Sequence, residues 1–138
     1  MQSGEHAAVG AAVSIAAAFV LFPGAPVTTL AALVAAGVAV SVFVDLDHFV
    51  IARGMAGDWH HLERALTNPR VGLLEQERVF ADIDEAALVH RRLLSHHLIA
   101  GALTLALALA GRGSLAVFAA VVLYAHVLCD YLRDLEYA

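Results

Sequence analysis

The sequence predicts an all-α protein, an integral membrane four-helix bundle with a long polar, partly helical segment between its second and third helices. Hydrophobic residues make up 61% of the 138 residues and charged residues only 15%. The apolar residues gather into four long runs that contain no charged residue. Soluble helices normally have a polar face, so we prefer a membrane bundle in one domain to a soluble one.

Short turns join the four runs in pairs. A bilayer core of ~30 Å needs about 20 helical residues, so polar residues that flank each run are expected to complete the spans. Residues 22–26 and 111–114 are rich in Pro or Gly and predict tight turns. No arginine precedes the first run, which we interpret as a retained helix rather than a signal peptide. The predicted helices cover about residues 6–22, 27–48, 83–111 and 114–133, with a polar insert at about 49–89.

Small residues recur at every fourth position in three of the runs. Such stripes allow helix backbones to approach closely in lipid, so they predict compact helix contacts. The three stripes are Gly10, Ser14 and Ala18; Ala31, Ala35 and Ala39; and Ala102, Ala106 and Ala110.

The polar insert has helical signals of its own. Residues 48–56 are expected either to continue the second helix or to lie in the membrane interface, and to end around Gly57 and Asp58. Residues 71–81 predict a short amphipathic helix. Asp82, three residues before Glu85, resembles a capping box and predicts that the third helix begins near Ile83. We therefore interpret Asp82 and Asp84 as helix caps and not as parts of a site.

Composition excludes several classes of function. The formal charge is -5 and no lysine is present, so no basic stripe is available to bind nucleic acid. The single cysteine, Cys129, lies inside an apolar run. A disulfide framework and a thiolate zinc site are therefore both excluded.

The order of the helices places the polar insert and both chain ends on one face of the membrane. All the arginines except Arg112 lie on that face. Cytoplasmic loops carry an excess of basic residues, so we expect a multi-pass inner-membrane protein with both termini in the cytoplasm. His60 and His61 follow Trp59, an interfacial type of residue, and are expected at the level of the lipid headgroups.

Histidine and aspartate residues gather at the helix ends on the same face. Ionisable residues near membrane depth are costly, so their arrival from four helices predicts a buried polar site. His126 and Asp130 are four residues apart, and Asp45 and His48 are three apart, so each pair shares one side of a helix. The residues expected to meet are His6, Asp45, Asp47, His48, His90, His96, His97, His126 and Asp130.

The third helix offers a choice of ligands. His90 and His97 lie seven residues apart and share a face, whereas His96 points about 100° away from His97 unless the helix begins between them. Whether His96 or His97 joins His90 therefore depends on where the helix begins. Arg91 and Arg92 are suited to bind an anionic group such as a phosphate.

Imidazole and carboxylate ligands without thiolate favour zinc, manganese or iron. The candidates outnumber the three or four ligands that one zinc ion needs, so we expect one or two divalent ions, with zinc or manganese preferred. The expected metal ligands are His6, Asp45, His48, His90, His96, His126 and Asp130.

In order and topology these residues resemble the membrane-bound metal-dependent hydrolases, also described as LexA-regulated inner-membrane hydrolases. The resemblance covers nearly the whole chain and implies a short helical membrane protein with a metal-dependent hydrolase activity. The sequence departs from the family pattern at Val44, where the family has proline, and at Ser95, where it has threonine. His90 and His96 are also one residue further apart than in the family. The matching elements are His6-x3-Gly10, Asp45-Leu46-Asp47-His48, His90-Arg91 with Ser95-His96, and His126-x3-Asp130.

The resulting hypothesis is metal-assisted hydrolysis at the cytoplasmic membrane surface. The expected substrate is a lipid or a lipid-linked phosphoester or ester, because the site lies near the membrane surface. Divalent ions would lower the pKa of a coordinated water toward ~7. Asp47 would orient a histidine or accept the proton of the water, and Arg91 would stabilise charge that develops on the substrate.

Two alternatives remain at this point. The first is a non-enzymatic membrane metal-binding or transport protein, although the apolar far halves of the helices argue against a polar pathway. The second is a phosphatidic-acid-phosphatase-like enzyme with a histidine nucleophile. His126-x3-Asp130 resembles the end of that family's motif, but the other elements of the motif are missing. Association with further copies of the chain is left open.

Overall fold

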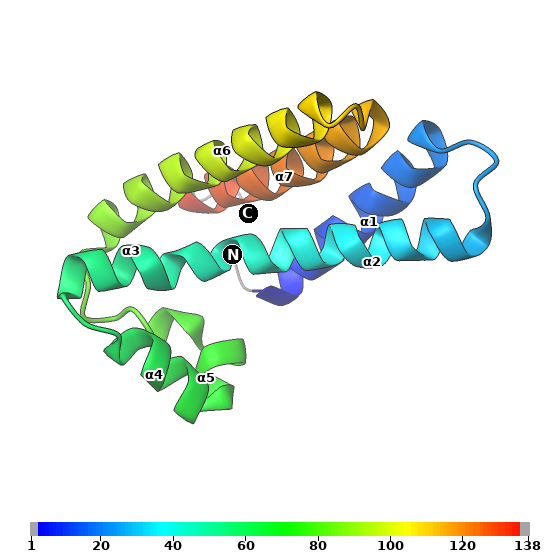
Figure 1. Cartoon of the computed structure of the whole chain (residues 1–138). Helices are drawn as coiled ribbons and strands as arrows, with labels where there is room; N and C mark the ends of the chain where they lie inside the picture. Colours follow the sequence, from blue (N-terminus) through cyan, green and yellow to red (C-terminus); the bar gives the residue numbers. More distant parts are fainter. Residues whose placement is uncertain (1–2, 136–138) are drawn as a thin grey trace.

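The apolar runs form long helices in the structure, a computed structural model that describes residues 3–135. α1 (Ser3–Leu21) and α2 (Val27–Phe43) form one antiparallel hairpin, and α6 (Glu85–Leu109) and α7 (Gly113–Asp134) form another (Figure 1). No strand occurs among residues 3–135, which confirms the all-α class. Four helical stretches within these residues are long and apolar enough to cross a membrane.

The second helix continues beyond Phe43. The 3-10 turn η1 (Val44–Leu46) and α3 (Asp47–Ala56) extend it in nearly the same direction (Figure 1). Gly57 ends α3 in the left-handed conformation, with φ of 89°, as glycine after a helix commonly does. The expected end of this helix near Gly57 is confirmed. Residues three apart nearly eclipse each other in a 3-10 turn, and η1 therefore keeps Asp45 on the same side as His48.

α7 is the central helix of the bundle. It packs against α1, α2 and α6, whereas α6 packs chiefly against α7 and α3. The buried apolar cluster consists of Ala17 and Ala18 from α1 with Phe118 and Val122 from α7. The helices therefore do not surround the core equally, and most of α6 lies exposed on the outer side of α7.

α1 and α2 cross at very close range. A Cβ atom at Gly37 would lie 1.9 Å from the Oγ atom of Ser14, and one at Gly10 would lie 2.7 Å from the Cβ atom of Ser41. The hydroxyl of Ser41 donates a hydrogen bond to the main-chain carbonyl of His6 at 3.0 Å. The crossing therefore sets how near the beginning of α1 lies to the end of α2.

The polar insert forms a small group of helices to one side of the long hairpins (Figure 1). It contains α4 (His60–Thr67), α5 (Pro69–Leu74) and η2 (Gln76–Arg78). The prediction of one amphipathic helix over 71–81 is wrong, because α5 ends at Leu74 and only a 3-10 turn follows.

The third long helix begins two residues later than expected. α6 starts at Glu85, and the side chain of Asp84 caps it by accepting a hydrogen bond from the amide of Ala87 at 3.1 Å. The prediction that Asp84 is a cap is confirmed, whereas the prediction that Asp82 is one is wrong. The carboxylate of Asp82 instead binds side chains of α4.

We predict that Gly37→Ala lowers stability while Gly101→Ala does not. The new methyl group at position 37 would collide with Ser14, and overpacking of this kind typically costs about 1–3 kcal/mol. Gly101 also lies inside a helix, but a Cβ atom there would meet nothing within 4 Å. Thermal unfolding of the two purified variants beside the wild type tests this difference. Equal unfolding temperatures for all three proteins would contradict the close crossing.

Candidate metal centre

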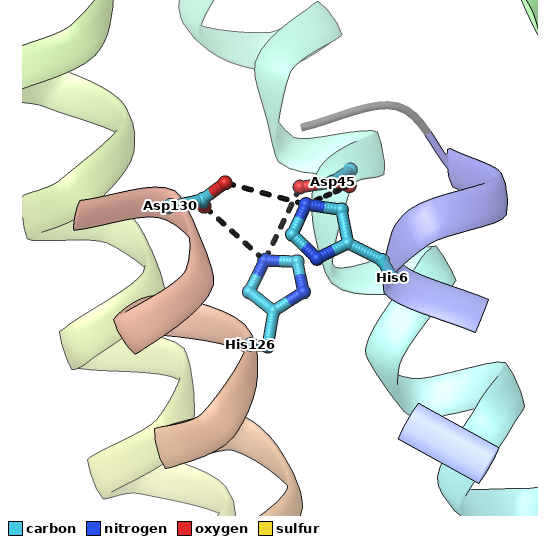
Figure 2. A group of neighbouring side chains, drawn as sticks. All are labelled: His6, Asp45, His126 and Asp130. Atoms are coloured by element: carbon cyan, nitrogen blue, oxygen red, sulfur yellow. Dashed lines mark ion pairs between the residues drawn. The ribbon is translucent and has the colours of Figure 1, made fainter. Parts of the chain in front are cut away.

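Four side chains from three segments meet at the end of the bundle where α1 begins and α7 ends. His6 projects from α1, Asp45 from η1, and His126 and Asp130 from α7 (Figure 2). The Nε2 atom of His6 lies 3.2 Å from Oδ1 of Asp130 and 3.8 Å from Oδ2 of Asp45. The Nε2 atom of His126 lies 3.4 Å from one carboxylate oxygen of each aspartate. The imidazole rings of His6 and His126 stack, with centroids 3.9 Å apart.

A second group shares Asp45 with the first and adds His48 and His96. The Nε2 atoms of His48 and His96 lie 3.5 and 3.6 Å from Oδ1 of Asp45. Asp47 lies beside both rings, with Oδ1 3.3 Å from Nε2 of His96 and 3.7 Å from Nε2 of His48. Nδ1 of His96 faces the first group and lies 3.2 Å from Oδ2 of Asp130. The two groups are therefore adjacent parts of one cluster, which we call the central cluster.

The central cluster is withdrawn from solvent. His6, His96, His126 and Asp130 are each at most 1% exposed. Nε2 of His6 faces the carboxylates of Asp130 and Asp45, whereas Nδ1 is buried without a hydrogen-bond partner. Buried polar groups are usually hydrogen-bonded, so Nδ1 is an exception to that pattern.

The separations within the cluster are compatible both with ion pairs and with a shared metal ion. Donor and acceptor atoms in N–H···O hydrogen bonds usually lie about 2.7–3.2 Å apart. The four nitrogen–oxygen separations in the first group are 3.2, 3.4, 3.4 and 3.8 Å. Ligand atoms around a tetrahedral zinc with bonds of about 2.0–2.2 Å are roughly 3.3–3.6 Å apart. These groups of imidazoles and carboxylates could therefore hold a metal ion.

The register of α6 decides between the histidines of the third long helix. Because α6 begins at Glu85, it runs without a break through this segment and turns His96 toward the cluster. His97 is exposed, and its Nδ1 atom lies 2.6 Å from the carbonyl oxygen of Leu93. His96 and not His97 therefore lies in the cluster.

His90 is not brought to the central cluster. It is exposed, and its Nδ1 atom lies 2.7 Å from the carbonyl oxygen of Ala86 one helical turn earlier. His90 and His97 do share a face of α6, as their spacing predicts, but His96 occupies the face that meets the other helices. The expectation that His90 is a ligand of the same site therefore finds no support in this geometry.

The two arginines of α6 also differ in position. Arg91 is exposed, whereas the side chain of Arg92 is 14% exposed and points toward α7. The guanidinium of Arg92 donates to both carboxylate oxygens of Asp134, at 2.7 and 2.5 Å. Its Nε atom lies 3.9 Å from Oδ2 of Asp130. Arg92, and not the expected Arg91, is the arginine that borders the cluster.

Comparisons with protein-family models, with curated proteins and with solved structures found no match to this chain. Its function is therefore argued from the geometry of the site.

An aromatic side chain of the polar insert covers the outer edge of the central cluster. The ring of Phe80 meets the ring of His48 edge to face, with centroids 6.1 Å apart. Phe80 also packs against Phe49 of α3, at 5.5 Å, and stacks on His61 of α4, at 5.7 Å. Phe80 therefore joins the insert to the helix that carries His48.

A second cluster, in the insert, was not anticipated from the sequence. His60 and His61 both bind the carboxylate of Asp82, and their level relative to the lipid headgroups stays a prediction. Hydrogen bonds from His60 to Asp58 and then to Asp82 raise the pKa of the His60 imidazole. The bond to His60 in turn lowers the pKa of Asp82. Only the pairing of His60 with His61 in the sequence signalled this cluster, since Asp82 lies 21 residues from His61.

Proposed function

We propose that the protein is a membrane-embedded, metal-dependent hydrolase that acts at the cytoplasmic membrane surface on a lipid or lipid-linked phosphoester or ester. The observation that carries this proposal is the position of Asp45 in both halves of a buried cluster of imidazoles and carboxylates. The family resemblance of the sequence motifs agrees with it.

The donor set supports one or two divalent ions. His6, His126 and Asp130 surround one side of Asp45, and His48 and His96 surround the other. Nitrogen and oxygen donors without sulfur suit zinc or manganese. Asp45 belongs to both groups, so its carboxylate would contribute to holding either ion. Ions bound there would supply Lewis acidity and a nucleophilic water at neutral pH.

Two neighbouring side chains have geometries that fit roles in hydrolysis. Oδ2 of Asp47 is buried and makes no hydrogen bond, so it is available to accept a proton from water. Oδ1 of the same carboxylate lies beside His96 and His48 and orients their rings. We assign the role of binding an anionic substrate group to Arg92 in place of Arg91, because Arg92 borders the cluster.

The distribution of side chains supports insertion in a membrane. Large apolar residues such as Phe19, Leu98 and Leu109 are exposed on the long helices. The buried positions on α1 and α2 hold mainly small residues. Water would penalise such an exposed apolar surface, whereas lipid would not. A lipid substrate would reach the central cluster from the surrounding bilayer.

A transport pathway is less well supported than a site at one end of the bundle. Within residues 3–135, the buried polar side chains of the long helices outside the cluster are Ser14 and Ser41. Ser41 is hydrogen-bonded to the backbone of α1. A non-enzymatic metal-binding protein would show the same cluster, and only an activity measurement separates it from a hydrolase.

We predict that Asp45→Asn removes more metal than any other single change in the central cluster. Asp45 contributes to both groups, whereas His48→Ala removes a ligand from only one of them. His90→Ala provides the control, because His90 is an exposed histidine outside the cluster. Elemental analysis of purified, zinc- or manganese-loaded variants measures the difference. Full metal content in Asp45→Asn would disprove the proposed site.

We predict that Asp47→Asn retains bound metal but lowers kcat by about 10²–10⁴-fold, the usual contribution of a general base. The assay uses metal-loaded protein in detergent micelles with phospholipids and synthetic phosphate and carboxylate esters as substrates. His97→Ala, an exposed change outside the cluster, is the matched control. If metal-loaded wild-type protein hydrolyses none of these substrates, the non-enzymatic metal-binding function replaces the hydrolase.

We predict that the insert faces the cytoplasm, because four of the eight arginines lie in it and three more lie on the same face. In a Cys129→Ser background, Ser114→Cys marks the α6–α7 turn and Thr67→Cys marks the insert, and both positions are exposed. A membrane-impermeant maleimide should label Ser114→Cys in intact right-side-out vesicles and Thr67→Cys only after permeabilisation. The reverse pattern would overturn the orientation, and protein that is soluble without detergent would overturn membrane insertion.

A further inference from the structure

The polar insert contains a second group of metal-ligating side chains, which we call the insert cluster: His60, His61 and Asp82. Oδ2 of Asp82 lies 2.9 Å from Nε2 of His60, and Oδ1 lies 3.2 Å from Nε2 of His61. One donor atom from each of the three side chains lies within 4.8 Å of the others. The insert cluster belongs to α4 and to the segment before α6, and it shares no residue with the central cluster.

Asp58 orients the ring of His60. Its Oδ1 atom makes a short hydrogen bond with Nδ1 of His60 and also accepts from the main-chain amide of His60, at 3.1 Å. Nε2 of His60 lies 2.9 Å from Oδ2 of Asp82, a separation at which a protonated ring donates a hydrogen bond. With the proton of a neutral ring at Nδ1 instead, Nε2 would offer its lone pair to a metal ion shared with Asp82. A carboxylate on the far nitrogen of a histidine is the usual support for a metal ligand.

The other two members of the insert cluster are also held in place. His61 is 1% exposed, and its ring stacks on Phe80 with an interplanar angle of 19°. Arg64 of α4 donates to Oδ1 of Asp82 at 3.1 Å and to the carbonyl oxygen of Val79 at 3.0 Å. These contacts fix the carboxylate relative to α4 before any ion arrives. Preorganised ligands of this kind lose little conformational freedom on binding.

We propose that His60, His61 and Asp82 form a second divalent-metal site, separate from the central cluster, with Asp58 as the positioning residue for His60. Two imidazoles and one carboxylate are a ligand set for zinc and related transition metals, and they leave coordination positions open to solvent. The half-exposed Asp82 side chain makes the site accessible from the aqueous phase. A bound ion would join α4 to the segment before α6. His61 and Asp82, one from each, are 21 residues apart in the sequence.

The principal competing explanation is a metal-free network in which Arg64 and protonated His60 balance Asp82. Both explanations predict that His60→Ala lowers the unfolding temperature, so stability alone does not separate them. Zinc content does, because only the metal site predicts that an ion is lost. The proposal does not depend on the proposed hydrolase activity, since Asp45→Asn disables the central cluster and leaves the insert cluster intact.

The experiment uses the full-length protein in detergent, stripped with chelator, titrated with zinc and measured by calorimetry and elemental analysis. Compared with Asp45→Asn alone, the double variant Asp45→Asn/His60→Ala should lose about one zinc equivalent. Asp45→Asn/Asp58→Asn, which keeps all three ligands, should bind that zinc about 10–100-fold more weakly. Asp45→Asn/His97→Ala should match Asp45→Asn and is the control for loss of a histidine outside both clusters.

Equal zinc content and affinity in Asp45→Asn and in the double variants with His60→Ala or Asp58→Asn would overturn the insert site. An unchanged zinc content in Asp45→Asn relative to wild type, followed by its complete loss in the His60 double variant, would support the insert site and remove the central one. The conservative Asp58→Asn change keeps the test decisive if His60→Ala fails to fold.

Discussion

The burial of carboxylates and imidazoles where α1, the continuous η1–α3 segment, α6 and α7 meet is the constraint on which the rest of the structure depends. A buried carboxylate is strongly unfavourable without a compensating positive group. In the central cluster, the carboxylates of Asp45, Asp47 and Asp130 each lie within 3.8 Å of at least two imidazole nitrogens. This arrangement requires four segments at fixed separations and rotations. The close crossing of α1 and α2 and the central place of α7 supply those separations.

The bundle is held together by small residues rather than by a large apolar core. Gly10, Ser14 and Ala18 are all buried on α1, while large apolar side chains such as Phe19 and Val20 point outward. Helix association in lipid depends on close backbone approach and dispersion contacts, because lipid supplies no hydrophobic drive between helices. The same arrangement brings the main chain of His6 within hydrogen-bonding distance of Ser41. Packing and ligand placement are therefore consequences of one contact.

Much of the fold could be predicted because hydropathy and turn residues report directly on long helices and on their order. The stripes of small residues were less informative, since only the stripe on α1 is buried and those on α2 and α6 are mostly exposed. The sequence shows which residues share a face but not which face meets a neighbour. For the same reason His90 and His97 were correctly placed on one face of α6, yet His96 is the residue that faces the cluster. Convergence of the helix ends could be predicted from topology, whereas rotation about each axis could not.

The insert was the least predictable part of the chain. Asp82 followed by Glu85 satisfies a local capping pattern, but a contact with histidines more than 20 residues away prevails. Such contacts depend on how a short helix folds back, and no periodicity in the sequence records that. The ligands assigned to the central cluster come mostly from helix ends with regular spacing, which explains why they were easier to identify. The members of the insert cluster come from the first turn of α4 and from the irregular segment before α6.

The position of Phe80 has a thermodynamic consequence. One ring packs on His61 of the insert cluster and on His48 of the central cluster. Energetic coupling between two binding sites is reciprocal. An ion bound in the insert cluster that favours one position of the Phe80 ring would change the affinity of the central cluster for an ion by some factor. An ion bound in the central cluster would then change the affinity of the insert cluster by the same factor. The folding free energy of the insert would then contribute to the affinity of the central cluster for any ion that it holds.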